Sequence, residues 1–227
     1  MSQLALPLRL QDHAVFETYW AARNEQAVAV VQDIADSPGE SGCWLWGPIA
    51  VGKSHLLQAA CERAGDSAIY LPLGDLLATG PGILDGIADR ALLALDDIQC
   101  VSGAEDWEMA LFTLFNAVSE SGGAMIVAAT APQRESGIQL PDLESRLATL
   151  PTFQLRSLDE TDRAAALQLR ARHRGLNLPD ETARYLLSRQ RRDMASLYAL
   201  LDRLDAEALA AQRRLTVPFV KSVLEGR

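Results

Sequence analysis

Short apolar runs alternate with longer amphipathic stretches over the first two thirds of the chain. Four of the runs have the length of a short buried strand, at residues 41–46, 67–72, 91–95 and 124–129. Around them, apolar residues recur with the spacing of one helix face at residues 27–34, 55–61 and 107–118. Strands that alternate with helices predict an α/β fold, in which helices cover both faces of a parallel sheet and form a three-layer αβα core.

The pattern changes near residue 157, after which no strand is needed. Helices are expected at residues 159–173, 179–191, 194–212 and 217–224. Asp159 and Asp180 stand where a helix N-terminus is capped or carries an acid in its first turn, and Gly175 fits a helix end. We therefore predict an extended segment over residues 1–11, an α/β domain over residues 12–156 and a small all-helical domain over residues 157–227.

Composition supports this division. The chain has 227 residues, is 48% hydrophobic and carries a formal net charge of −9. Residues 1–156 contain 8 Lys and Arg against 20 Asp and Glu, whereas residues 157–227 contain 13 against 10. Such an acidic protein is a poor candidate for tight, independent DNA binding, because contacts to phosphates supply most of that affinity.

Other sequence features exclude several classes of protein. Cys43, Cys61 and Cys100 are odd in number and widely spaced, which indicates buried reduced thiols rather than disulfides or a zinc site. No apolar run reaches the roughly 18 residues of a membrane span. Pro7 and Arg9 interrupt any signal-peptide pattern at the start, so we expect a cytoplasmic protein.

Residues 47–54 fit the phosphate-binding pattern G-x-x-x-x-G-K-[ST] at every fixed position. The glycines let backbone N–H groups turn toward phosphate oxygens, and the helix that begins near Lys53 adds its positive N-terminal end. Lys53 is expected to reach the outer phosphates, and the hydroxyl of Ser54 to coordinate Mg²⁺. The sequence thus predicts a site for ADP or ATP with Mg²⁺. Its residues are Gly47, Pro48, Ile49, Ala50, Val51, Gly52, Lys53, Ser54 and His55.

Two carboxylates follow the apolar run at residues 91–95. That strand would deliver Asp96 to the sheet edge beside the phosphates, where it can hold Mg²⁺ through water, while Asp97 can orient or activate the attacking water. Thr130 follows the run at residues 124–129. It can contact the outer phosphate or its water, and as a single threonine it could equally cap the end of a strand.

The first residues of the chain are unusually apolar for a terminus. Pro7 favours an extended backbone through Leu6, which suits a peptide that inserts side chains into pockets. Either the segment packs on its own domain, or it enters the groove of a partner. It resembles the short peptide through which many replication proteins dock on the bacterial sliding clamp, and the residues that match are Gln3, Leu4, Leu6, Pro7 and Leu8.

The order of these motifs resembles that of the AAA+ ATPases. The sequence Asp96-Asp97-Ile98-Gln99 is similar to the replication initiator DnaA, and the resemblance covers about residues 12–224. The chain is expected to stop where DnaA continues into its helix-turn-helix DNA-binding domain. Together with the clamp-like peptide, this arrangement is similar to the Hda family of DnaA-related regulators, which residues 176–224 also resemble.

That resemblance implies a negative regulator of replication initiation. In the family, the N-terminal peptide binds the DNA-loaded clamp, the β subunit of DNA polymerase III, and the protein carries ADP. An arginine then reaches across to a DnaA·ATP molecule and stimulates hydrolysis. Arg146 matches this arginine finger by position, and a guanidinium delivered in trans can contribute roughly 10³ to 10⁵ in rate. DNA would be reached indirectly, through the clamp.

One departure concerns the helical domain. Ala195 stands where the lid of the family carries an arginine that contacts nucleotide, and Arg192, about one turn earlier, is a candidate replacement. This departure leaves open whether the protein is itself an efficient ATPase. The alternatives are a self-sufficient AAA+ ATPase such as a helicase loader, or an adaptor recruited to the clamp. A homo-oligomer, with the N-terminal peptide docked on a neighbouring copy, also stays open.

Overall fold

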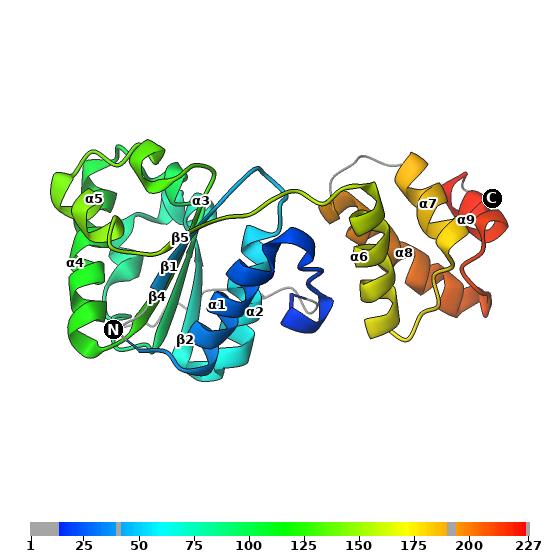
Figure 1. Ribbon diagram of the computed structural model, residues 1–227, viewed down its shortest axis with the longest axis horizontal. Coiled ribbons are helices and arrows are strands. Elements are labelled where there is room, and N and C mark those ends of the chain that lie inside the picture. Colours follow the sequence, from blue (N-terminus) through cyan, green and yellow to red (C-terminus); the bar gives the residue numbers. More distant parts are fainter. Residues whose placement is uncertain (1–13, 40–41, 190–193, 226–227) are drawn as a thin grey trace. The chain divides into compact units, whose positions relative to one another are not determined.

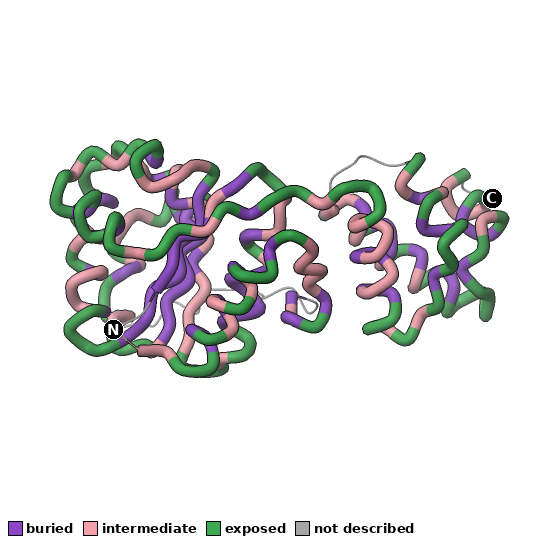
Figure 2. The backbone as a smooth tube through the Cα atoms, in the orientation of Figure 1, coloured by how far each residue is buried: buried purple, intermediate pink, exposed green. Residues whose placement is uncertain are grey.

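The computed structural model describes residues 14–39, 42–189 and 194–225. The described residues form a five-stranded parallel sheet with the order β2-β3-β4-β1-β5 (Figure 1). Its strands are β1 (Gly42–Trp46), β2 (Ala68–Pro72), β3 (Leu92–Asp96), β4 (Ala124–Ala129) and β5 (Thr152–Gln154). The central strands are buried on both faces, which explains their continuous apolar sequence (Figure 2). The predicted α/β fold is confirmed, and four strands begin and end within one residue of the predicted bounds.

Strand β5 was not predicted. It contains three residues and pairs with β1 at one edge of the sheet. Two of its side chains are exposed and the third is half-buried, so the sequence shows no apolar run there. Without such a run, the sequence of a short edge strand cannot be told from that of a loop.

Helices cover both faces of the sheet, as the three-layer prediction requires. One face packs against α1 (Glu25–Asp36) and α2 (Lys53–Ala64). The other packs against α3 (Leu73–Leu76), α4 (Glu105–Ser121) and α5 (Pro141–Leu147) (Figure 1). Alternate residues of a strand serve opposite faces, and Trp44 joins the core under α4 and α5.

The C-terminal part of the chain is helical throughout its described residues. It contains α6 (Glu160–His173), α7 (Asp180–Arg189), α8 (Met194–Ala211) and α9 (Val217–Leu224). Asp159 caps α6 as predicted, since its side chain accepts a hydrogen bond from the backbone N–H of Asp162 at 2.9 Å. A separate core forms from these helices, with Leu167, Leu186, Leu201 and Leu204 among its buried residues. Among the described residues, no helix is both long and apolar enough to cross a membrane.

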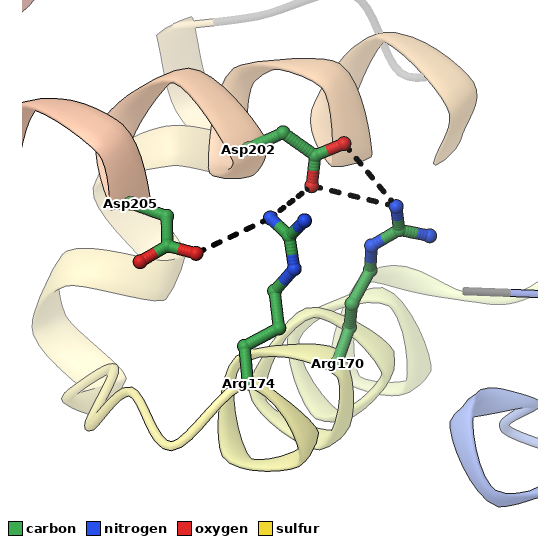
Figure 3. Close-up of polar contacts among 4 residues, drawn as sticks. All are labelled: Arg170, Arg174, Asp202 and Asp205. Carbon is green, nitrogen blue, oxygen red and sulfur yellow. Dashed lines mark hydrogen bonds and ion pairs between the residues drawn. The ribbon is translucent and has the colours of Figure 1, made fainter. Parts of the chain in front are cut away.

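A cluster of ion pairs joins α6 to α8 (Figure 3). The guanidinium of Arg174 donates to Asp202 at 2.6 Å and lies 3.4 Å from the carboxylate of Asp205. Arg170 donates to both oxygens of Asp202, at 3.4 and 3.3 Å, and its guanidinium lies 4.4 Å from the centre of the Tyr198 ring. Arg170 is buried, so these contacts offset part of the cost of removing its charge from water.

The chain divides into two compact units, and the division is not a single cut in the sequence. Asn24–Arg156 belongs to the α/β unit, whereas the helical unit contains Glu17–Arg23 together with the chain from Ser157 onward. Trp20 donates its indole N–H to Asp162 at 3.1 Å, which ties the early segment to the start of α6. The side chain of Asn24, in turn, donates to the carbonyl of Arg156 at 3.0 Å and accepts from its N–H at 2.8 Å.

Candidate nucleotide site

The phosphate-binding pattern forms a tight loop between β1 and α2. Gly47 has φ 156°, and a Cβ atom there would lie 2.6 Å from the carbonyl oxygen of Leu155, so the position excludes a side chain. Ala50 and Gly52 also have positive φ values, 63° and 103°. These turns bring the chain directly into α2, whose first N–H groups have no partner within the helix. The loop therefore has the local geometry that phosphate binding requires.

Lys53 lies across this loop. Its ammonium donates to the carbonyl oxygens of Gly47 at 2.9 Å and Pro48 at 3.0 Å, and the residue is 6% exposed. Burial lowers the pKa of Lys53, while the carboxylates of Asp96 and Asp97 raise it. A buried cation held against the loop is in the place where phosphate oxygens can become its partners.

Asp96 lies at the end of β3, almost fully buried at 1% exposure. The phenol of Tyr70 donates to its Oδ2 at 2.8 Å, and the N–H of Asp97 donates to its Oδ1 at 3.0 Å. Burial raises the pKa of Asp96, and hydrogen bonds from Ser54 and Tyr70 oppose that rise. The structure thus brings together Ser54 and Asp96, the two predicted Mg²⁺ ligands.

The two oxygen donors of Ser54 and Asp96 suit a Mg²⁺ ion that is also bound by phosphates and water. In the part of the chain that the structure describes, no group of three or more His, Cys, Asp or Glu side chains could hold a metal ion. Mg²⁺ at nucleotide sites is normally held by one or two protein oxygens together with phosphates and water. The hydroxyl of Ser54 and the carboxylate of Asp96 fit such a site.

Gln99 connects Asp97 to Thr130. Its side-chain amide donates to Oδ1 of Asp97 at 2.9 Å, and its carbonyl accepts from the backbone N–H of Thr130 at 3.2 Å. Asp97 adopts a left-handed backbone conformation, φ 55° and ψ 46°, which sharply reverses the chain after β3. The two predicted catalytic positions at the ends of β3 and β4 are therefore joined through one side chain.

Sequence reasoning did not single out Tyr70 or Gln99 as site residues. Tyr70 is a polar aromatic residue within an apolar strand, and β2 lies beside β3 with Pro72 opposite Asp96. The sheet order thus brings its phenol to Asp96. Gln99 was named only as the last residue of the sequence Asp96-Asp97-Ile98-Gln99. Its two contacts depend on the reversal of the chain at Asp97.

The sequence also pointed to His55, Ala195, Arg192 and the segment Gln3–Leu8. A ring nitrogen of His55 lies 2.9 Å from the carbonyl oxygen of Val15. Ala195 falls in the first turn of α8. Arg192 and the segment Gln3–Leu8 lie outside the described residues.

Arg146 lies near the amino ends of the strands, whereas the phosphate loop follows the carboxyl end of β1. It lines a hollow of about 330 Å³ together with Gly42 and Met125, at the amino ends of β1 and β4. The phosphate loop follows the other end of β1, and four residue steps along a strand span about 13 Å. The geometry therefore separates Arg146 from the chain's own Lys53.

Two family models match separate parts of the sequence. The model of the bacterial DnaA ATPase domain matches residues 10–70, which include the phosphate loop, and the model of the Hda lid domain matches residues 159–224. The chain is a DnaA-related, Hda-like AAA+ protein. The lid match covers α6 to α9, and Ala195 lies within it.

Solved structures share the fold of this Hda-like protein. Domain III of Thermotoga maritima DnaA is similar with a TM-score of 0.76 and 19% identity, over 96% of this chain and 98% of that one. AMPPCP-bound DnaA from Aquifex aeolicus has a TM-score of 0.67 and 21% identity, over 86% of this chain and 66% of that one. The branch-migration motor RuvB of Thermotoga maritima has a TM-score of 0.63 and 16% identity, over 88% and 67%. At these identities, the likeness shows the AAA+ fold.

Proposed function

We propose that this Hda-like protein is a negative regulator of replication initiation that stimulates hydrolysis of the ATP bound to DnaA. In this proposal it carries ADP in its own phosphate loop and docks on the DNA-loaded sliding clamp. Arg146 then reaches the phosphates of a DnaA·ATP molecule in trans. A guanidinium at that place stabilises the charge that develops on the phosphoryl group in the transition state.

The position of Arg146 carries this proposal. The residue lies on α5 near the amino ends of the strands, while Lys53 and Asp96 lie at their carboxyl ends. Among the described residues, no carboxylate pairs with its guanidinium. An exposed, uncompensated cation remote from the chain's own nucleotide site favours a role on another molecule.

The chain's own nucleotide would be held by the loop residues Gly47 to Ser54. Lys53 would neutralise the outer phosphates, and Ser54 and Asp96 would hold Mg²⁺, which draws charge from the phosphate oxygens when it is bound. The solved DnaA structures that contain AMPPCP support nucleotide binding by the shared fold. We place ADP here, rather than ATP, on the family resemblance.

Docking on the clamp is assigned to Gln3, Leu4, Leu6, Pro7 and Leu8. Their sequence supports the assignment, since an extended apolar peptide suits pockets on a partner surface. This tether would raise the local concentration of the regulator near DnaA on the same DNA.

A second candidate function is ATP hydrolysis by this chain itself. Asp97 and Thr130 meet through Gln99 beside the loop that carries Lys53, which is the arrangement that in-chain hydrolysis needs. A helicase loader would use these groups. An adaptor would need only the fold and the N-terminal peptide.

The test is ATP turnover by DnaA on primed DNA that carries loaded clamp, with and without this protein. We expect acceleration that requires the clamp and residues 3–8, and that Arg146→Ala abolishes while clamp binding stays unchanged. Arg134→Ala, which removes another exposed arginine of the α/β unit, is the control and should keep the acceleration. Stimulation retained by Arg146→Ala would exclude the finger, and turnover without DnaA would favour the self-sufficient ATPase.

A further inference from the structure

The helix that carries Arg146 is too short to be stable by itself. α5 contains seven residues, and isolated helices below about 12 residues are marginal in water. Leu143 and Leu147, one turn apart, are buried in the core, which fixes one face of the helix. Arg146 lies beside that face, so a small rotation or shift of α5 would displace its guanidinium.

The N-terminal end of α5 is held by Glu108 of α4. Its carboxylate accepts hydrogen bonds from the backbone N–H of Leu140 at 2.6 Å and of Gln139 at 3.0 Å. It also accepts from the N–H of Gly103 at 2.6 Å. Glu108 is 2% exposed, so a buried charge is satisfied entirely by backbone donors. Two of these donors belong to the residues that immediately precede α5.

The C-terminal end of α5 is held by Gln133, which follows β4. Its side-chain amide donates to the carbonyl oxygens of Leu147 at 3.2 Å and Leu150 at 2.9 Å. Its side-chain oxygen accepts from the hydroxyl of Thr152 in β5. One amide group therefore ties the end of α5 to the edge strand, and it stands three residues after Thr130.

We propose that Glu108 and Gln133 are positioning residues for Arg146. They hold the two ends of α5 from different parts of the chain, Glu108 from α4 and Gln133 from the segment after β4. The inference rests on the proposed function of Arg146. A guanidinium that acts across an interface has to meet its target within a fraction of an ångström, and a displacement of about 1 Å can cost roughly 10²-fold in rate.

The experiment measures DnaA ATP turnover on clamp-loaded DNA against the concentration of this protein. Glu108→Gln replaces one acceptor oxygen with an NH₂ group that faces backbone donors. Glu105→Gln makes the same chemical change at an exposed position of α4 and is the control. Gln133→Met removes the amide but keeps the length of the side chain, with Arg134→Met at the exposed next residue as its control.

We expect both positioning variants to lower the maximal stimulated rate by about tenfold or more. The concentration that gives half-maximal stimulation should stay within about twofold, because docking does not depend on α5 in this proposal. Amide hydrogens of residues 142–147 should exchange faster in both variants, while those of β3 and β4 stay unchanged. Both controls should behave as the unmodified protein.

Two results would overturn the inference alone: folded variants that keep the maximal rate while Arg146→Ala is inactive, or a loss confined to the half-maximal concentration. If Glu108→Gln does not fold, Gln133→Met decides, since Gln133 is half-exposed and its loss leaves the core intact. If Arg146→Ala itself remains active, the proposed function fails as well. The two failures are therefore distinguishable.

Discussion

The side chain of Asn24 allows a quantitative test of how much the contact between residues 24 and 156 stabilises the α/β unit. Asn24 is 3% exposed and makes two hydrogen bonds to the backbone of Arg156, 132 residues away. In Asn24→Ala both backbone groups lose their partner. A hydrogen bond contributes about 1 kcal/mol net, and an unpaired buried group costs about 1–3 kcal/mol. Because Arg156 is itself exposed and water can reach it, we expect a loss of about 2 kcal/mol in unfolding free energy.

Urea unfolding followed by tryptophan fluorescence measures this loss. Trp44, Trp46 and Trp107 belong to the α/β unit, so the signal reports mainly on that unit. With an m-value of about 2 kcal/mol/M, a loss of about 2 kcal/mol lowers the midpoint by about 1 M. Asn177→Ala, at an exposed asparagine of the helical unit, is the control and should stay within about 0.5 kcal/mol.

An Asn24→Ala midpoint equal to that of the control would refute the reasoning. It would mean that the backbone of Arg156 finds equivalent partners in water. A lower m-value with an unchanged midpoint would point instead to a change in cooperativity between the two units.

Two further predictions concern charged groups. Asp96→Asn should raise the urea midpoint at neutral pH and weaken Mg²⁺-dependent nucleotide binding, because it removes a buried charge and a metal ligand. Burial raises the folded-state pKa of Asp96 above its ordinary 3.8, so the contribution of this group to stability should fall as pH rises above that value. The difference in urea midpoint between Asp96→Asn and the unmodified protein should therefore grow over the same pH range. Asp202→Ala leaves Arg170 and Arg174 without their shared carboxylate. Since Asp202 is 37% exposed, we expect a loss of about 1–2 kcal/mol, less than the 3–5 kcal/mol typical of full burial, with Glu207→Ala on the same helix as an unaffected control.

The elements predicted correctly are those whose sequence carries the signal locally. β3 is apolar at every position before Asp96 because both faces are covered, and the loop at residues 47–54 is fixed by backbone requirements that only certain residues meet. β5 has no such signal, since it is short and lies at the sheet edge.

The residues that support the site could not be predicted in the same way. Tyr70 reaches Asp96 because β2 lies beside β3, and Glu108 meets Gln139 and Leu140 because α5 folds back against α4. Each contact joins positions about 26 to 32 residues apart. Polar side chains whose partners belong to another element leave no spacing pattern, so these contacts can be recognised only once the packing of the elements is known.

The assignment of Glu17–Arg23 to the helical unit affects how this domain can be exchanged. A fragment that begins at Ser157 would leave Asp162 without the indole of Trp20, and Asp159 without Arg23, whose guanidinium lies 3.7 Å from its carboxylate. A chimera that takes the lid of a relative therefore needs three junctions: between Phe16 and Glu17, between Arg23 and Asn24, and between Arg156 and Ser157. The last two junctions flank the Asn24–Arg156 pair. A recombined gene therefore carries a matched lid only when the segment Glu17–Arg23 and the chain from Ser157 onward come from the same parent.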